Sequence, residues 1–297
     1  MKYLVTGGEG FIGRNLRTEL ETAGNEVVAL DIIGNPEIKG SILDYDLVFK
    51  STVNIDGVFH LAAVTSPPQF ESNLDLGFTT NVNGTLNVLK ASAENNVEKV
   101  VLASSSAIYG NINVPGKESM KVPGHENMYS TTKLIDEYIG KYFTLRNELE
   151  VVSMRFFNAY GAGENSKGMY SSVISKFLSN ISRNEPPIIF GNGEQSRDFV
   201  YVEDIAGAAY QAMKKGRPGE SYNVGTGVSN TFNFILSSIN EVLGTNAKPI
   251  YQKNPFKNYQ YFTQADTKKT ERELRWKSEF DLSEGITKTA RLMGMLN

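Results

Sequence analysis

The N-terminal segment holds the feature that most limits what this chain can fold into. An apolar run, Tyr3–Thr6, leads into Gly7–Gly13, which fits both G-x-G-x-x-G and G-x-x-G-x-x-G. A helical pattern starts at Phe11, and a second apolar run ends at Asp31. Glycines at these positions let the backbone turn tightly and approach a pyrophosphate, which then sits on the helix N-terminus. The segment therefore predicts a dinucleotide-binding βαβ unit.

Asp31 indicates which dinucleotide binds. A carboxylate at the end of the second strand accepts hydrogen bonds from the adenosine ribose hydroxyls. The residues that follow, Ile32 and Ile33, are apolar, and no Arg or Lys occurs before Lys39 to hold a 2′-phosphate. We therefore expect NAD rather than NADP. The alternative, a glycine-rich turn without a ligand, does not explain why strand, loop, helix and acidic residue occur in this order.

Strand-like and helix-like segments alternate along the first half of the chain. Further apolar runs lie at Val27–Leu30, Val58–Ala62, Lys99–Ala103 and Val151–Phe156. Helical stretches are Phe11–Ala23, Leu74–Asn95 and Ser130–Arg146. This alternation predicts right-handed βαβ units in a doubly wound parallel sheet.

After Gly161 the pattern is looser. We expect a helix at Ser171–Ser182, a strand pair at Ile188–Phe190 and Asp198–Val202, a helix from Glu203, a loop-rich segment at 246–263 and a last helix at Ser283–Met293. The fold class predicted is α/β, with a Rossmann domain over residues 1–162 and a smaller α/β substrate lobe over residues 163–297. Elements near residues 197–227 are expected to return to the Rossmann side.

Composition excludes several classes of chemistry. The 297 residues contain no cysteine and only two histidines, so thiol nucleophiles, disulfides and metal sites are not expected. A net charge of -3 gives no support for nucleic-acid binding. No apolar stretch approaches the roughly 20 residues that span a membrane, and the N-terminal apolar run is too short for a signal peptide. We therefore expect a cytoplasmic protein.

Tyr129 and Lys133 are the acid–base candidates. Their spacing of four residues at the start of a predicted helix places both side chains on one helix face. The preceding strand ends at Ser104–Ser106, and the carboxyl ends of parallel strands face the ligand crevice. A nearby ammonium favours the phenolate, so Lys133 makes Tyr129 a better base, while Ser105 bonds the same substrate oxygen. The alternative is an exposed tyrosine beside helix-capping serines.

Two further polar residues stand in apolar surroundings. Asn81 lies on a helix whose other face is apolar, and from the pattern alone we interpret it as solvent-facing. His60 lies inside an apolar strand, and we interpret it as a core histidine with satisfied hydrogen bonds.

At this point the chain resembles the extended short-chain dehydrogenase/reductases that act on nucleotide sugars. The matching segments run in order over nearly the whole chain: Thr6–Gly13, Asp31, His60–Ala63, Asn81–Thr85, Ser104–Gly110, Tyr129–Lys133, Arg155–Asn158, Arg197–Val202 and Tyr222–Gly225. The resemblance implies that Ser105, Tyr129 and Lys133 are catalytic. It also places Asn81 in a fourth, lysine-organising position, against the interpretation as solvent-facing.

The resemblance also implies the binding residues. Those for NAD are Gly7, Gly10, Phe11, Ile12, Gly13, Asp31, Ile32, Ile42, Leu61, Ala62, Ala63, Asn81, Ser104, Tyr129, Lys133 and Phe156. Those for the nucleotide-diphosphate sugar are Ser105, Ser106, Tyr129, Asn158, Arg197 and Lys257, with Arg197 as a charge-assisted clamp on the diphosphate. A homodimer is implied, formed through the helices near residues 74–95 and 130–146.

Within the family, the similarity is greatest to epimerases of the UDP-glucose/UDP-galactose type. The 4,6-dehydratases carry an Asp-Glu pair just after the catalytic hydroxyl, whereas this chain has Ser106 and Ala107, so loss of water is not expected. The epimerase resemblance implies that Tyr129 takes the O4 proton while NAD takes hydride from C4. The keto sugar then turns over in the pocket, and hydride returns to its other face.

One segment departs from the pattern of these epimerases. Phe256 and Tyr259 occupy positions where Arg and Asp are expected, and Lys257 is a candidate replacement for the charge. The runs 168–173 and 261–266 are more similar to ADP-heptose 6-epimerases. Heptose epimerisation and net reduction or dehydrogenation of a nucleotide sugar therefore stay open, as does an N-acetylated sugar beside the small Thr263. A non-catalytic NAD-sensing regulator is a remote alternative, because the catalytic set is intact.

Overall fold

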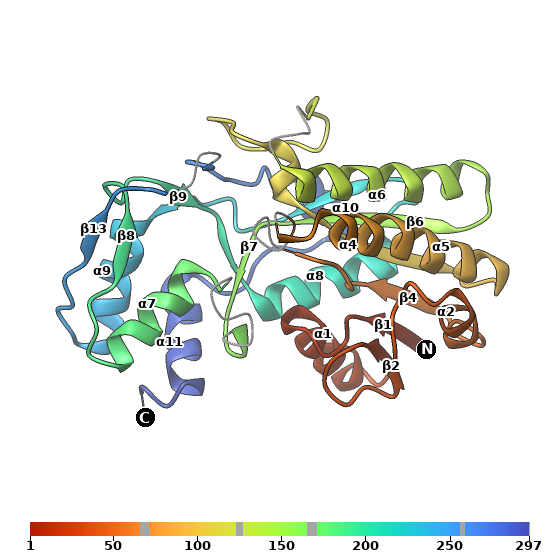
Figure 1. The fold of residues 1–297 in the computed structure, drawn as a ribbon, viewed down its shortest axis with the longest axis horizontal. Coiled ribbons are helices and arrows are strands. Elements are labelled where there is room, and N and C mark those ends of the chain that lie inside the picture. Colours follow the sequence, from red (N-terminus) through yellow and green to blue (C-terminus); the bar gives the residue numbers. More distant parts are fainter. Residues whose placement is uncertain (66–69, 71, 123–126, 165–170, 256–258, 297) are drawn as a thin grey trace.

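The computed structural model describes residues 1–65, 70, 72–122, 127–164, 171–255 and 259–296. Its main body is a Rossmann-type sheet of seven parallel strands, which confirms the predicted fold class (Figure 1). The strands, in spatial order, are β11 (Ser221–Val224), β6 (Glu150–Phe156), β5 (Lys99–Ser105), β4 (Gly57–His60), β1 (Lys2–Thr6), β2 (Glu26–Asp31) and β3 (Ile38–Lys39). Within the described ranges, no helix combines the length and apolar character needed to cross a membrane.

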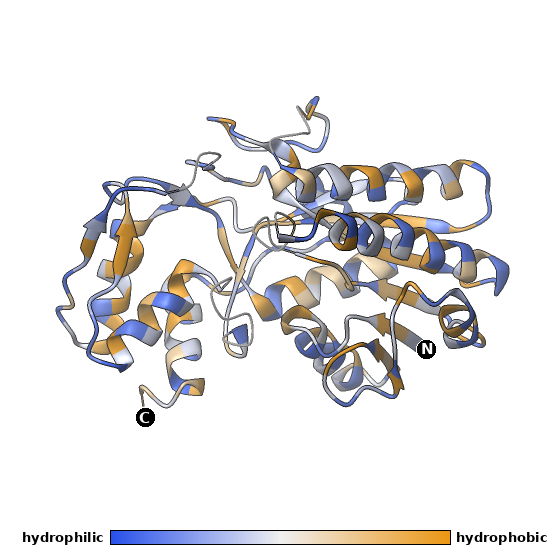
Figure 2. Cartoon of the chain, in the orientation of Figure 1, coloured by the Kyte–Doolittle hydropathy of each residue, from blue (hydrophilic) through white to orange (hydrophobic). Residues whose placement is uncertain are grey.

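Helices cover both faces of this sheet (Figure 1). One face carries α2 (Tyr45–Ser51), α4 (Leu74–Phe78), α5 (Gly84–Glu94) and α6 (Met128–Leu145), and the other carries α1 (Phe11–Thr22) and α8 (Val202–Lys215). Because strand side chains alternate, Tyr3 and Val5 of β1 enter one core while Leu4 enters the other. The strands of this sheet are mostly coloured as hydrophobic in Figure 2, as a sheet buried on both sides requires.

The remaining elements form a smaller body at the opposite end of the molecule (Figure 1). It contains α7 (Val173–Ser182), α9 (Phe232–Leu243), α11 (Leu282–Leu292), β8 (Ile188–Phe190) and β13 (Ile250–Gln252), around a third apolar core. Short strand pairs link the two bodies: β7 (Asn158–Tyr160) with β10 (Phe199–Tyr201), and β9 (Ser196–Arg197) with β12 (Asn230–Thr231). The chain returns to the large sheet at β11, leaves it again through β12, α9 and β13, and then forms α10 (Lys268–Leu274) beside β11.

Two expectations need correction. The expected strands near residues 188–190 and 198–202 do not pair with each other, because β8 pairs with β13 and β10 pairs with β7, partners that lie far away in the sequence. The helix expected over 74–95 is interrupted by a π-helical turn, η1 (Thr79–Asn83), between α4 and α5. The described part of 246–263 is loop-rich as expected, and it also supplies the short strand β13.

His60 is the core histidine that the sequence predicts. Its ring is buried, with Nδ1 2.7 Å from Thr6 Oγ1 and Nε2 3.0 Å from Thr85 Oγ1. Burial lowers the pKa of His60 to about 3, and the positive charge of Lys133 acts in the same direction. The imidazole therefore stays neutral in the folded protein at ordinary pH.

This depressed pKa predicts a stability loss in acid. Below the unfolded pKa of about 6.5, the unfolded chain binds a proton that folded His60 does not, so stability falls with pH until the folded pKa is reached. Between pH 7 and pH 5 we expect His60 to account for about 2 kcal/mol of the lost unfolding free energy. Denaturant titration of wild type and His60→Gln at both pH values measures this difference. Equal pH slopes in the two proteins would contradict it.

Candidate active site

The parallel sheet brings many of the predicted site residues to one edge. Gly7 follows β1, Asp31 ends β2, Leu61–Ala63 follows β4, Ser105 ends β5 and Phe156 ends β6. Register aligns these ends: Ser105 pairs with Phe156. The crevice at this edge is where doubly wound sheets bind ligands.

The glycine loop has no room for side chains at the positions the motif predicts. Gly7 adopts φ +71, and a Cβ there would lie 2.7 Å from the backbone nitrogen of Ala62. A Cβ on Gly13 would collide with the carbonyl oxygen of Gly7. Helix α1 starts directly after the loop, at the buried Phe11 and half-buried Ile12. This bare backbone at a helix N-terminus fits a dinucleotide pyrophosphate.

The Asp31 carboxylate is oriented by backbone groups. Its Oδ2 accepts from the N–H of Glu9 at 2.9 Å, and its Oδ1 accepts from the N–H of Ile33 at 3.1 Å. Two cationic side chains close to Asp31 in the sequence, Arg17 and Lys39, already bond to other groups. Arg17 is held by Glu9 and by Glu37, the latter at 2.8 Å, and Lys39 donates to the Gly34 carbonyl.

The two apolar residues predicted beside the cofactor differ in their surroundings. Ile32 is 65% exposed at the open end of β2, whereas Ile42 is buried in the core beneath α5. A Cβ on Gly84 of α5 would meet the Ile42 side chain. Ile32 is therefore accessible to a ligand, while Ile42 is mainly a packing residue.

The first two turns of α6 carry Tyr129 and Lys133. The helix is capped by Asn127, whose side chain accepts from the N–H of Ser130 at 2.8 Å. Tyr129 is half-buried and its ring centroid lies 6.0 Å from that of Phe70, while Lys133 is only 3% exposed. The helix thus presents the phenol near the surface of the crevice and the ammonium deeper inside.

Ser105 ends β5 and caps the short 3-10 helix η2 (Ser106–Tyr109). Its Oγ accepts from the N–H of Ala107 at 3.1 Å. The capping interpretation is therefore confirmed for Ser105, and its hydroxyl can still donate a hydrogen, because a hydroxyl both donates and accepts. The neighbouring Ser106 is buried at the first position of η2.

Asn81 is buried, so the interpretation as a solvent-facing residue is wrong. Its side chain is 0% exposed and closes a pair of hydrogen bonds with the backbone of Val64, at 2.8 and 3.1 Å. Its Nδ2 also donates to Oγ1 of Thr132, at 3.1 Å. Thr132 directly precedes Lys133. The π turn η1 directs Asn81 to this position, as π turns often do at functional sites.

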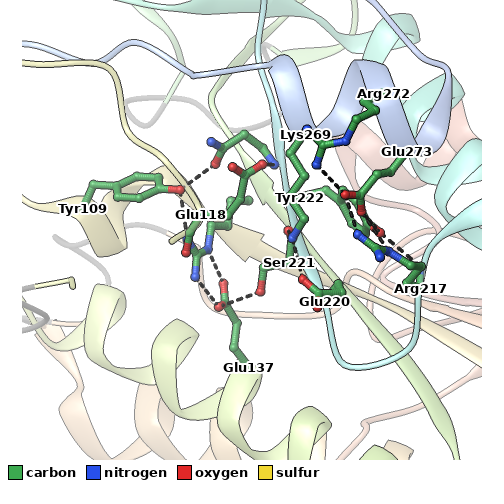
Figure 3. A network of polar contacts seen from close by, with 12 residues as sticks. Tyr109, Glu118, Glu137, Arg217, Glu220, Ser221, Tyr222, Lys269, Arg272 and Glu273 are labelled. Carbon is green, nitrogen blue, oxygen red and sulfur yellow. Dashed lines mark hydrogen bonds and ion pairs between the residues drawn. The ribbon is translucent and has the colours of Figure 1, made fainter. Parts of the chain in front are cut away.

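A buried polar network holds α6 against the sheet (Figure 3). Glu137 receives two bonds from Arg155 of β6, at 2.9 and 2.8 Å, and further bonds from Ser104 and Ser221. Tyr109 accepts from Arg155 at 2.9 Å. Sequence reasoning gave Glu137 no role, although the charged Asp136-Glu137 pair within a buried helix face was a usable signal.

Asn158 and Arg197 lie together where the two bodies meet. Asn158 Nδ2 donates to the Asp198 carbonyl at 3.1 Å and to Thr263 Oγ1 at 2.9 Å. Arg197, 8% exposed, donates to the carbonyls of Ser196 and Gln260. Lys257 and Phe256, also expected here, lie outside the described residues.

Arg197 has a charge that no described carboxylate neutralises through an ion pair. Its guanidinium lies between the rings of Phe232 and Tyr259, at 5.8 and 5.3 Å from their centroids. Burial lowers the pKa of Arg197. A buried, ring-flanked guanidinium of this kind is suited to an anionic ligand.

Comparisons with known proteins agree with this geometry. A family model described as "NAD dependent epimerase/dehydratase family" matches residues 3–225. The chain is 33% identical over 306 residues to a putative UDP-glucose 4-epimerase from Methanocaldococcus jannaschii, covering 98% of this chain and 97% of that protein. It is 30% identical over 267 residues to a UDP-N-acetyl-alpha-D-glucosaminuronate decarboxylase from Bacillus cytotoxicus, covering 84% and 82%.

A solved structure is similar over nearly its whole length. It is a UDP-N-acetylglucosamine 4-epimerase from Methanobrevibacter ruminantium M1 in complex with UDP-N-acetylmuramic acid. The TM-score is 0.92 at 31% sequence identity, covering 98% of this chain and 97% of that chain.

The surroundings of Asp31 predict a preference between dinucleotides. NAD should bind at least about tenfold more tightly than NADP, because a 2′-phosphate would meet the Asp31 carboxylate while Arg17 is held by two glutamates. Asp31→Asn should narrow this ratio. Calorimetric titration of both dinucleotides into wild type and variant measures it, and equal affinities in the wild type would contradict the assigned role of Asp31.

Proposed function

This chain belongs to the NAD-dependent epimerase/dehydratase family of enzymes, and we propose that it is a nucleotide-sugar 4-epimerase of the UDP-glucose/UDP-galactose type. NAD is its cofactor. What supports the proposal is that α6, which carries Tyr129 and Lys133, packs against β5 and η2, where Ser105 lies, at the sheet edge where the glycine loop follows β1.

In the proposed reaction each of these residues has a distinct task. Tyr129 removes the proton from the sugar O4, assisted by the positive charge of buried Lys133. Ser105 donates its free hydroxyl hydrogen to the same oxygen. Asn81 keeps the turn that carries Thr132 and Lys133 in place through its bonds to Val64. A bound NAD would supply the reversible hydride transfer at C4 that this reaction needs.

The position after Ser105 argues for epimerisation over loss of water. Expulsion of a C6 hydroxyl needs an acid near the sugar, and the first residues of η2 are Ser106 and Ala107, which cannot donate as carboxylic acids. Arg197 and Asn158 are proposed to hold the diphosphate, because Asn158 bonds to the carbonyl of Asp198, the residue after Arg197, at the junction of the two bodies. Because one relative is a decarboxylase, decarboxylation is also among the outcomes to be tested.

A substrate panel tests the proposal directly. Purified protein is incubated with UDP-glucose, UDP-N-acetylglucosamine, UDP-glucuronate, ADP-heptose and a dTDP-4-keto sugar, and products are followed by NMR. We expect interconversion of UDP-glucose and UDP-galactose without added NAD, since no net oxidation occurs. Three results would contradict the proposed reaction: conversion of ADP-heptose alone, release of CO₂, or consumption of external reduced cofactor.

Removal of the phenolic oxygen tests the assigned base. Tyr129→Phe should lower turnover by about 10²–10⁴-fold, because it deletes the proton acceptor. NAD affinity should change less than about threefold, since the ring is retained. Tyr45→Phe, at a half-buried tyrosine of α2, is the matched control and should keep full turnover. Near-normal turnover of Tyr129→Phe would disprove the assignment.

We also propose a homodimer formed through α5 and α6. Leu86 of α5 and Tyr138, Tyr142 and Leu145 of α6 are 43–73% exposed. Of these, Leu86, Tyr138 and Tyr142 line an apolar groove between the two helices, together with Ile135, Ile139 and Phe143. Figure 2 shows apolar segments along α6. An apolar surface of this kind is characteristic of an interaction site, and a second copy would present the same helices.

A charge placed in the groove should separate the protomers. Leu86→Lys is expected to elute at the mass of one chain, whereas wild type elutes at twice that mass, because a lysine cannot be buried there without a partner. Light scattering after size-exclusion chromatography measures both masses. Ile250→Lys, on exposed β13 of the smaller body, is the control and should stay dimeric. A monomeric wild type would contradict the proposal.

A further inference from the structure

A buried carboxylate beside Lys133 has no task in the proposed reaction. Asp136, on the next turn of α6, is 0% exposed, and its Oδ2 lies 3.3 Å from Lys133 Nζ. Its Oδ1 makes no hydrogen bond to any described residue. A buried, incompletely bonded carboxylate is costly, so its presence beside a catalytic candidate needs a physical explanation.

Lys133 and Asp136 compensate each other electrostatically. Each side chain is almost completely buried. Among the described residues, neither group forms any other ion pair. Burial raises the pKa of Asp136 to about 6, although the ammonium of Lys133 and the hydroxyl of Thr85 oppose this effect. Asp136 is therefore ionised at neutral pH and takes up a proton in mild acid.

The other groups around Asp136 leave this pair isolated. Glu137, adjacent on α6, is itself paired with Arg155 of β6. His60 of β4 is neutral, and Thr85 of α5 and Asn81 of η1 carry no charge. Among the described residues, the charge that Lys133 places next to Tyr129 is thus balanced by Asp136.

We propose that Asp136 is a positioning residue that acts through Lys133, holding its ammonium inside the protein and setting the pH at which the Tyr129–Lys133 pair gives up a proton. The proposal rests on the catalytic roles assigned above. A negative charge near Tyr129 and Lys133 increases the affinity of both groups for protons, so its removal should favour loss of the Tyr129 proton at lower pH. Asp136 also compensates the Lys133 ammonium, which has no other ion pair among the described residues.

The titration of Tyr129 provides a readout that needs no sugar substrate. The NAD-loaded enzyme is labelled with [¹³Cζ]tyrosine, and the Tyr129 resonance is identified by its absence in Tyr129→Phe. In Asp136→Asn we expect its midpoint to move about one pH unit toward acid, because the opposing charge is gone. Asp136→Ala should move it in the same direction. Asp75→Asn, which removes an exposed carboxylate of α4, should leave it unchanged.

Turnover provides the second readout. The acid limb of the kcat profile should shift with the Tyr129 midpoint in Asp136→Asn, and the two proteins should converge below about pH 6, where Asp136 is protonated in the wild type. A lower kcat with unshifted midpoints in both Asp136 variants would overturn the proposal, since that is the result of a packing defect. A shift toward alkaline pH would also overturn it.

These readouts separate this inference from the proposed function. If no UDP-sugar reacts but the Tyr129 resonance shifts in Asp136→Asn, the substrate assignment fails and the coupling through Lys133 stands. If UDP-glucose reacts and the resonance does not move, the epimerase assignment stands and the role of Asp136 fails.

Discussion

The buried ion pair between Glu137 of α6 and Arg155 of β6 is the interaction on which the arrangement of the site depends. Two nearly parallel hydrogen bonds hold the helix at one height against the sheet, and both side chains are less than 10% exposed. A guanidinium and a carboxylate match in this geometry because both are planar and offer paired donors and acceptors. Removing either partner would leave an uncompensated charge in the core, at a cost of about 3–5 kcal/mol.

This pair relates the helix that carries Tyr129 to the strand that carries Ser105. Ser104, beside Ser105, donates to Glu137. The end of β5 is therefore bonded to a carboxylate that belongs to α6. Asn81 links Thr132, near the start of α6, to Val64 in the loop after β4. Three strands and one helix are therefore connected by bonds with strict geometry. A site that depends on hydrogen-bond distances gains from such a frame, because apolar packing alone does not fix the angle or register of polar groups.

The buried charges follow different patterns in the two bodies of the molecule. In the Rossmann domain, Glu137 has Arg155 and Lys133 has Asp136, so the main charges are balanced inside the protein. Arg197, at the junction with the smaller body, contacts aromatic rings and carbonyl oxygens instead of a carboxylate. That contrast fits the proposed division of tasks, in which the Rossmann side performs chemistry and the junction receives an anionic diphosphate.

Local patterns in the sequence by themselves determined the glycine loop, Asp31, the buried parallel strands and the core position of His60. Each depends on residue type and short spacing: glycine where backbones approach, a carboxylate at a strand end, and continuous apolar runs where both sheet faces are covered. Only the tertiary structure decided that Asn81 is buried, that β8 pairs with β13, and that Glu137 meets Arg155. Those outcomes depend on partners brought together from distant parts of the chain, and no local pattern states which of several possible partners a polar group or an edge strand will meet.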